Sequence, residues 1–226
     1  MAEAAAGYAI ELDARPIKTP VRATLAVPTR KLAEAVAAEW QEQGETIDPR
    51  SMPLTGLANA AIDRVAPDPA AFAAGLAQFG ESDLLCYRAE GPAPLVARQA
   101  DHWDPVLAWA RRRYDVELKV TVGVIHQKQP EATVARLARA VAARSPFELA
   151  GLSPLVTVSG SLIIALALAE GELDVEQAWA AAIVDDQWQA EKWGEDAEAV
   201  HALANRRQDF AAGARLLELL DQSVSA

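Results

Sequence analysis

The spacing of apolar residues along the chain predicts short strands first and helices afterwards. Segments 8–12 and 15–19 flank a tight two-residue connection, and 24–27 adds another extended piece, which together favour a small antiparallel meander. Beyond it, apolar side chains recur at helical spacing, and Thr29 is suited to cap the first helix. The pattern therefore predicts an α+β protein with a small N-terminal β-rich domain and a larger α-helical domain.

Two later segments have strand-like patterns. Residues 83–88 are predicted to form a buried strand, a candidate to join the first meander, and 117–124 alternates with valines on one side, so its period predicts a strand. Proline and glycine within 89–94 indicate a domain boundary. This boundary divides the chain into an N-terminal β-rich domain with helices, residues 1–90, and a C-terminal helical domain, residues 91–226.

Helices account for most of the second domain. The predicted helices span 95–114, 131–144, 155–169, 175–193 and 197 to about 222. Ser153-Pro154 is expected to restart the chain after a shorter helical segment, and the apolar helix 155–169 is expected to be buried on all sides in the centre of a bundle. Polar residues interrupt this region, so a buried helix is favoured over a membrane span.

The helix 175–193 has a carboxylate within its apolar stripe. At about 100° per residue, one face carries Val175, Trp179, Ala182, Asp186, Ala190 and Trp193. A buried charge needs a partner because an unpaired one costs several kcal/mol, and Arg207, equally out of place in the apolar stripe of the last helix, is the internal candidate. A structural ion pair and a functional carboxylate are therefore both open for Asp186.

The tryptophans divide into core and contact candidates. Trp179 and Trp193 lie on the apolar stripe and are expected in the core. Trp188 lies about half a turn from Trp179 among polar residues, so it is the candidate for contact with a partner. Trp40 continues an apolar stripe of the first helix, which favours core packing, with a partner contact as the alternative.

Composition and charge narrow the classes of function. The chain has 32 acidic and 21 basic residues and a net charge of −11, which disfavours nucleic acid and anionic membranes as partners. The single cysteine, Cys86, indicates a reducing compartment, and the N-terminus has neither a secretory signal nor an Arg-rich transit peptide. We therefore expect a cytoplasmic protein without integral membrane insertion.

The residue types that usually bind metals or take part in catalysis do not form recognisable motifs in this chain. His102, His126 and His201 have no second His or Cys at metal-ligand spacing, and neither a phosphate-binding glycine loop nor a G-x-S-x-G elbow occurs. The expectation is accordingly no metal, no cofactor and no catalytic residues. The alternative is a small-molecule enzyme with a site between the β-rich and helical domains that uses Asp186 and Arg207, and a scaffold without a client is a third possibility.

Six motifs occur in a fixed order along nearly the whole chain. They are Leu12-Asp13-Ala14-Arg15-Pro16-Ile17-Lys18-Thr19-Pro20, Glu39-Trp40 with Gln43, Met52-Pro53-Leu54-Thr55, Asp83-Leu84-Leu85-Cys86-Tyr87-Arg88, Ser159-Gly160-Ser161-Leu162 and Gln189-Ala190-Glu191-Lys192-Trp193-Gly194-Glu195-Asp196. In this order they resemble the F1-ATPase assembly chaperone family, of the ATP synthase assembly factor 2 type. Ala14 stands where the family usually has glycine, which makes the predicted two-residue hairpin less secure.

The resemblance implies a non-enzymatic chaperone that binds the free α subunit of F1-ATPase until the β subunit replaces it. The lack of a transit peptide favours a bacterial member that acts in the cytoplasm, whereas eukaryotic relatives are in the mitochondrial matrix. The chain is expected to be monomeric when free. The family's functional acidic positions correspond to Asp185 and Asp186, and Gln187 stands where a third acidic residue is common. The candidate partner-binding residues are Asp185, Asp186, Trp188, Glu191, Trp193 and Trp40.

Overall fold

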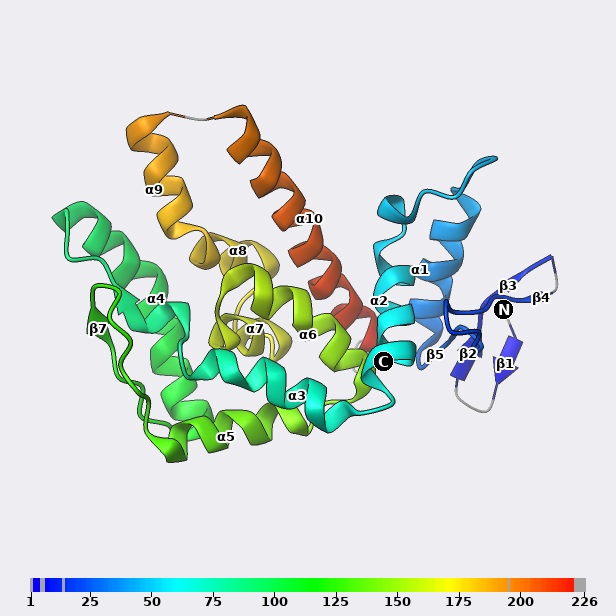
Figure 1. Ribbon diagram of the computed structural model, residues 1–226, viewed down its shortest axis with the longest axis horizontal. Helices are drawn as coiled ribbons and strands as arrows, with labels where there is room; N and C mark the ends of the chain where they lie inside the picture. Colours follow the sequence, from blue (N-terminus) through cyan, green and yellow to red (C-terminus); the bar gives the residue numbers. More distant parts are fainter. Residues whose placement is uncertain (1, 5–6, 14, 195, 222–226) are drawn as a thin grey trace.

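The computed structural model describes residues 2–4, 7–13, 15–194 and 196–221. A small group of strands lies at the N-terminal end, and the rest of the molecule is mostly helical, with one short strand pair among the helices (Figure 1). This arrangement confirms the predicted α+β class. None of the helices in the described part of the chain combines the length and apolar character that crossing a membrane requires.

The N-terminal strands form the predicted meander as two small antiparallel sheets. The strands are β1 (Ala2–Ala4), β2 (Gly7–Ala9), β3 (Glu11–Leu12), β4 (Arg15–Pro16) and β5 (Ala26–Val27). One sheet has the order β1-β2-β5, with Tyr8 opposite Val27, and the other pairs β3 with β4. Between the paired ends, Ile10 and Leu25 are fully buried, and the Ile10 amide donates to the Leu25 carbonyl at 3.0 Å. The strands thus contribute Ile10, Leu25 and Val27 to the same hydrophobic core that the helices share.

Side chains cap the first helix of the N-terminal part and join it to the second. They are α1 (Arg30–Gln41), the single turn η1 (Pro49–Ser51), α2 (Pro53–Ala60) with its π-helical extension η2 (Ala61–Val65), α3 (Pro69–Ala77) and η3 (Gln78–Gly80). Thr29 caps α1 as predicted, accepting from the Leu32 amide. Glu39 of α1 accepts from the Leu54 amide at 2.8 Å and the Thr55 amide at 2.7 Å, so its carboxylate holds the start of α2 against α1.

The prediction of one buried strand at residues 83–88 is wrong. The segment forms a 3-10 turn, η4 (Leu84–Cys86), followed by the two-residue strand β6 (Tyr87–Arg88). β6 pairs in parallel with β7 (Thr121–Val122) and not with the N-terminal meander. β7 is also the only part of the predicted strand 117–124 that pairs in a sheet within the described residues.

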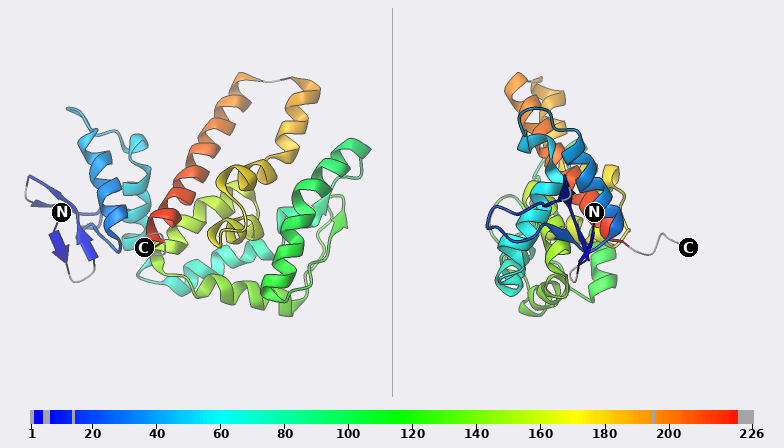
Figure 2. Two further views of the ribbon diagram at one scale, coloured as in Figure 1. Left: turned by 180° about the vertical axis from the view of Figure 1, so that it is seen from behind. Right: turned by 90° about the vertical axis from the view of Figure 1, so that its right-hand side faces the viewer.

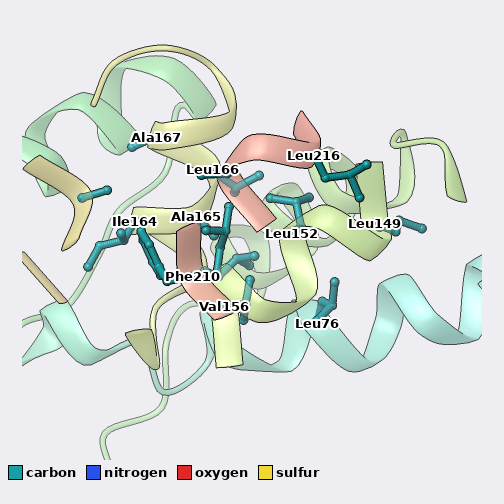
Figure 3. Close-up of a cluster of buried hydrophobic side chains, with 14 of the residues drawn as sticks. Leu76, Leu149, Leu152, Val156, Ile164, Ala165, Leu166, Ala167, Phe210 and Leu216 are labelled. Carbon is teal, nitrogen blue, oxygen red and sulfur yellow. The ribbon is translucent and has the colours of Figure 1, made fainter. Parts of the chain in front are cut away.

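The remaining helices form a bundle around one buried helix. They are α4 (Ala93–Tyr114), α5 (Glu131–Ala142), α6 (Pro146–Ser159), α7 (Leu162–Ala169), α8 (Val175–Ala182), α9 (Val184–Trp193) and α10 (Ala197–Leu220). α7 is the predicted central helix, because residues 162–167 are fully buried. Figure 3 shows side chains of α6, α7 and α10 gathered in one cluster, with Leu76 of α3 on the side of α6. The expected restart at Ser153-Pro154 is wrong, since α6 continues through Pro154 to Ser159.

The predicted domain boundary at residues 90 and 91 stays a prediction. α3 precedes it in the sequence yet packs against α5 and α6, and α10 at the other end of the chain packs against α1 and α2. In Figure 1 the strands β1–β5 and α1 lie at one end of the molecule, and α3 runs beneath the bundle beside α5. Contacts therefore cross the sequence boundary in both directions.

α6 and α10 approach each other through two glycines. A Cβ atom at Gly213 would lie 2.6 Å from the Gly151 carbonyl oxygen and 2.7 Å from the Pro154 ring, and a Cβ atom at Gly151 would lie 2.9 Å from Leu217. Real Cβ atoms are essentially never that close to other heavy atoms. The separation of the two helices is therefore set by the absence of side chains at these positions.

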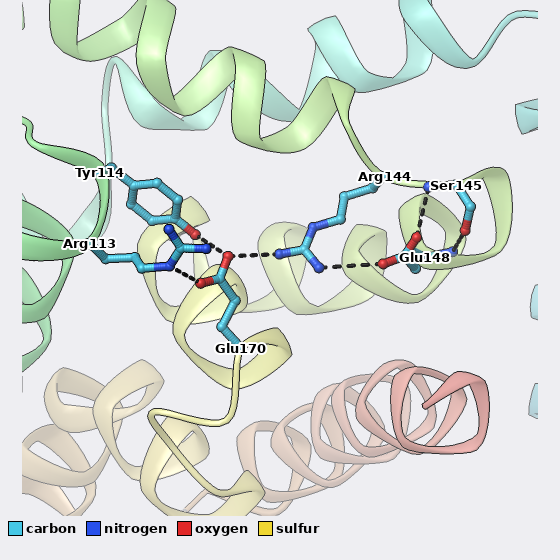
Figure 4. Close-up of polar contacts among 6 residues, drawn as sticks. All are labelled: Arg113, Tyr114, Arg144, Ser145, Glu148 and Glu170. Carbon is cyan, nitrogen blue, oxygen red and sulfur yellow. Dashed lines mark hydrogen bonds and ion pairs between the residues drawn. The ribbon is translucent and has the colours of Figure 1, made fainter. Parts of the chain in front are cut away.

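Polar side chains tie the helix ends together on the side of the bundle away from α9. Glu170, which follows α7, accepts from the Tyr114 hydroxyl at 2.7 Å and from Arg144 at 2.9 Å, and it also pairs with Arg113 (Figure 4). Arg144 in turn donates to Glu148, which forms the capping box of α6 with Ser145. The network joins the end of α4 to the ends of α5 and α7 and to the start of α6.

Asp83 makes the stability of the fold depend on pH. Its carboxylate is fully buried, and burial raises its pKa from 3.8 to about 6 against the opposing effect of its hydrogen bonds. Because the unfolded chain releases this proton near pH ~4, the folded state holds more protons between about pH 4 and about pH 6. The contribution of Asp83 to the free energy of unfolding should therefore fall, by up to about 3 kcal/mol, as the pH rises through that window.

Urea unfolding of the wild type and the Asp83→Asn variant tests whether the contribution of Asp83 to the free energy of unfolding falls as the pH rises. The wild-type stability minus that of the variant should be smaller at about pH 7 than at about pH 4.5. The exposed Asp104→Asn change serves as a control and should give nearly the same difference at both values. A difference for Asp83→Asn that grows with pH would contradict the assignment.

Candidate functional site

α9 is the element on which most of the candidate residues lie. It stands between α4 and α10, and the views from front and back agree on this order (Figures 1 and 2). Trp40 belongs to α1, on the other side of α10. The structure thus brings Asp185, Asp186, Trp188, Glu191 and Trp193 together on one helix and places Trp40 elsewhere.

The predicted single helix 175–193 is two helices. Ile183 has φ −114° and ψ 19°, which is not helical, so α8 ends at Ala182 and α9 begins at Val184. A change of backbone angles at one residue alters the direction of every side chain that follows relative to those before it. The stripe that linked Trp179 to Asp186 and Trp193 therefore does not exist.

The consequence is that the two tryptophans of α9 exchange their expected positions. Trp188, the predicted contact, is buried at 7% exposure, whereas Trp193, predicted in the core, is 77% exposed. Trp188 has the Arg98 guanidinium 5.1 Å and the Lys192 ammonium 4.7 Å from its ring centroid. Trp179 is buried as expected and packs against Phe210 with 5.5 Å between ring centroids.

Two carboxylates of α9 bind to α4. Glu191 accepts two hydrogen bonds from Arg98, at 2.7 and 2.8 Å, and this pairing lowers the pKa of Glu191. Asp185 is half-buried and accepts from the Gln99 side-chain amide at 2.8 Å, and the oxygen of the same amide accepts from the Ala89 backbone. Both contacts fix α9 against α4, so neither carboxylate is free of a structural role.

The third carboxylate faces α10, but its partner is not the predicted one. Asp186 is exposed and pairs with Arg206 at 3.1 Å. Arg207 pairs with Glu176 of α8 and lies 5.4 Å from the centroid of the Trp179 ring. The predicted Asp186–Arg207 pair is therefore wrong by one position along α10, because consecutive residues on a helix point about 100° apart.

Trp40 is half-buried and packs against the core, as its stripe predicted. Its indole nitrogen is buried and has no hydrogen-bond partner among the described residues. Its neighbour Glu39 holds the start of α2. The Glu39-Trp40 motif thus has a structural role in joining α1 to α2.

A hollow of about 610 Å³ opens between α4, α9 and the β6–β7 strands. Its walls are mostly apolar and include Leu95, Trp188, Trp193 and Val124, and Asp185 with Gln99 supplies polar groups. Val124 is 94% exposed and its neighbour Ile125 is 81% exposed. Large apolar side chains therefore stand at the rim of the hollow in contact with water.

The arrangement is suited to binding an apolar surface and offers little for catalysis. Exposed apolar groups with a polar border are typical of protein interaction sites. No group of three or more metal-ligating side chains lies close enough to hold a metal anywhere in the described residues. The sequence did not identify Val124 and Ile125 as candidate contact residues. The signal for them was the alternating valines of the predicted strand 117–124, which had no evident strand to pair with.

Comparisons with known proteins identify relatives of this chain. The sequence model of the ATP12 chaperone protein family matches residues 1–111. The chain is 27% identical over 205 residues to the protein named atp12, mitochondrial, of Schizosaccharomyces pombe, an alignment that covers 84% of this chain and 70% of the relative.

Solved structures extend the likeness over nearly the whole chain. The crystal structure of Atp12 from Paracoccus denitrificans is 42% identical, with a TM-score of 0.93, and covers 97% of this chain and 94% of its own. The Atu1473 protein of Agrobacterium tumefaciens is 44% identical, with a TM-score of 0.90, over 95% of this chain and 81% of its own. Identity of this extent shows that the chain belongs to the ATP12 chaperone family.

Proposed function

We propose that this chain is an assembly chaperone of ATP synthase that binds the free α subunit of F1-ATPase. It covers the apolar surface through which that subunit assembles, and the β subunit displaces it by taking the same surface. Binding the free subunit lowers the concentration of the aggregation-prone form by mass action, so no hydrolysis of ATP is required. The chain is accordingly a chaperone and not an enzyme.

The exposure of Trp193 supports our proposal of where on the molecule the client binds. Tryptophan is the residue type most often found as an energetic centre of protein interfaces, and this one is 77% exposed at the rim of an apolar hollow. Val124 and Ile125 extend the apolar rim onto the segment that follows β7. We therefore place the client on the end of the molecule formed by α4, α9 and the β6–β7 strands.

The acidic side chains of α9 are expected to orient the client more than to increase its affinity. The chain carries a net charge of −11, and Asp186 and Glu191 lie exposed on the same helix as Trp193. Acidic groups at the border of an interface steer a partner with complementary charge and raise the association rate. Because Asp185 and Glu191 also hold α9 to α4, their replacement should affect binding partly through the position of the helix.

Co-purification tests the proposal directly. The chaperone should capture the F1 α subunit of its own organism at micromolar concentrations, and addition of the β subunit should release it. The free chaperone is proposed to be monomeric and cytoplasmic. Failure to associate with the α subunit, or a complex that persists unchanged when the β subunit is added in excess, would contradict this function.

Replacement of Trp193 by alanine should weaken binding of the α subunit by about tenfold or more, which is about 1.4 kcal/mol. The melting temperature should stay within about 1 °C because the side chain is mostly exposed. Isothermal titration and a thermal melt measure the two quantities. Val21→Ala is the control, since Val21 is 66% exposed at the N-terminal end and should have no effect on either.

The alternative enzyme has no support from the geometry. It required Asp186 and Arg207 to line one cleft, but these side chains pair with different partners, Arg206 and Glu176. Asp186 is also exposed, with 43% of its side chain open to solvent, so it lacks the burial that adapts a carboxylate to acid–base chemistry.

A further inference from the structure

The extended segment 117–122 has its inner edge fully bonded by side chains. The Lys119 amide donates to the Gln129 side-chain oxygen at 2.9 Å, and the Gln129 nitrogen donates to the Lys119 carbonyl at 2.9 Å. Two residues earlier, the Thr133 hydroxyl accepts from the Glu117 amide and donates to the Glu117 carbonyl. Gln129 and Thr133 are both buried and thus act as the missing neighbouring strand.

The same edge continues into the sheet with β6. Thr121 lies opposite Tyr87 and Val122 opposite Arg88, and the Gly123 amide donates to the Arg88 carbonyl at 2.8 Å. This register directs the backbone groups of the odd-numbered residues towards β6. In an extended chain the groups of neighbouring residues point to opposite sides, so those of the even-numbered residues point outward.

The outer edge has almost no hydrogen-bond partners. The Leu118 carbonyl accepts from Arg111 at 3.1 Å, whereas the backbone amide and carbonyl of Val120 have no hydrogen-bond partner within the described part of the chain. By the register, the amide and carbonyl of Val122 also face away from β6. An unpaired row of amide and carbonyl groups is a template for another strand, and natural proteins usually protect such rows.

Apolar side chains accompany this open edge. Val120 is 41% exposed and Val122 is 61% exposed. Because they are two residues apart in an extended segment, their side chains project on the same face. Gly123 then turns the chain with φ +83°, and Val124 follows in the wall of the hollow beside Trp193. The open edge is therefore continuous with the proposed client surface.

We propose that the outer edge of residues 120–122 binds an extended apolar segment of the F1 α subunit as an added β-strand. This inference rests on the proposed function and specifies how the client is held. Backbone hydrogen bonds to Val120 and Val122 supply the pairing, and alternate apolar side chains of the client pack on the two valines. Strand addition of this kind recognises an extended main chain with little demand on sequence.

Amide hydrogen exchange of the chaperone, alone and with the purified α subunit, tests the pairing. In the free protein the amides of Val120 and Val122 should exchange rapidly, and in the complex their exchange should slow by at least about tenfold. The Lys119 amide is the internal control, because its bond to Gln129 protects it in both states. A complex in which Val120 and Val122 stay unprotected overturns the added strand and leaves the chaperone function intact.

The outcomes separate the two levels of the proposal. Absence of any complex at micromolar concentrations overturns both the function and the strand addition. Protection of Val120 in the free protein that increases with concentration, together with the mass of a dimer, assigns the edge to a second copy of this chain and also overturns the inference.

A backbone substitution gives an independent measurement. Val120→Pro removes the outward amide, and edge positions with that amide facing solvent tolerate proline. Its affinity for the α subunit should fall by at least about tenfold, whereas Val120→Thr, which keeps the amide and the branched shape, should lose less than about threefold. Equal affinities for the two variants, with unchanged thermal melts, would refute the role of the backbone.

Discussion

Replacement of Asp83 by alanine is expected to lower the free energy of unfolding by about 3 kcal/mol or more. The buried carboxylate accepts from the Ser161 hydroxyl at 2.7 Å, the Ile163 amide at 3.0 Å and the Leu85 amide at 3.1 Å. Alanine leaves three buried donors without a partner, and each unsatisfied buried donor costs about 1–3 kcal/mol. Asp83 also fixes the start of the central helix α7, so the loss affects the most buried element of the fold.

Urea unfolding at about pH 7 measures this loss, with Asp104→Ala as the matched control. Asp104 is likewise an aspartate, and it pairs with Arg88 at 2.7 Å, but its side chain is 63% exposed, so its removal should cost less than about 1 kcal/mol. In a chain of this length, 3 kcal/mol corresponds to a fall in melting temperature of about 6–12 °C. A change for Asp83→Ala no larger than that of the control would refute its anchoring role.

Replacement of Gly213 by alanine is expected to destabilise the fold by about 2–3 kcal/mol, although alanine is the better helix former. The added methyl would lie 2.6 Å from the backbone oxygen of Gly151 and 2.7 Å from Pro154. A backbone atom and a proline ring cannot move aside as a flexible side chain can. α6 and α10 must therefore separate, and the leucines buried between them lose contacts.

Gly75→Ala in α3 is the matched control for this change. Gly75 is an exposed helical glycine with nothing within 4 Å of an added Cβ atom, so alanine there should stabilise the protein by about 0.5–1 kcal/mol. The two substitutions are chemically identical and are expected to have opposite signs in a thermal melt. Stabilisation by Gly213→Ala would mean that the helix crossing is looser than the structure indicates.

Local signals in the sequence predicted much of the fold. Thr29 caps the first helix at the predicted place because an N-cap acts within three residues of itself, and Asp174 and Ser145 cap later helices in the same way. The meander and the buried helix 162–169 also follow from patterns that lie within one short segment. Such features need no information from distant parts of the chain.

The errors arose where distant contacts or a single torsion decide the outcome. Residues 83–88 have the composition of a strand, but Asp83 bonds to Ser161 and Ile163, and the Leu84 amide donates to the Gly160 carbonyl. These contacts cross about eighty positions of the chain. They favour a turn at the place where the local pattern favoured an extended segment.

The candidate site was only partly accessible from the sequence. Helical periodicity assumes constant backbone angles, and the non-helical angles of Ile183 reversed the expected burial of Trp188 and Trp193. The family motifs indicated the right helix for the site, and the structure adds Arg98 and Gln99 of α4 as the groups that hold it. Which carboxylate of α9 contacts a client stays a prediction.

Several motifs now have a structural explanation that is separate from client binding. The Glu39-Trp40 and Pro53-Leu54-Thr55 motifs meet because the Glu39 carboxylate binds the start of α2. The motifs that contain Asp83 and Ser161 meet in the same way at the start of α7. Substitutions in these motifs should therefore lower stability before they alter recognition, in contrast to substitutions at Trp193.

The contact between Thr29 and Leu219 has a consequence for synthesis on the ribosome. The Thr29 hydroxyl that caps α1 also donates to the Leu219 carbonyl at 2.7 Å, across 190 positions of the chain. α10 covers α1, α2 and α6, which all leave the ribosome before it. Because α10 completes this packing, the apolar faces of those helices stay open to water until α10 has also left the ribosome. The nascent chaperone thus exposes its own aggregation-prone surface while the intervening segments are made.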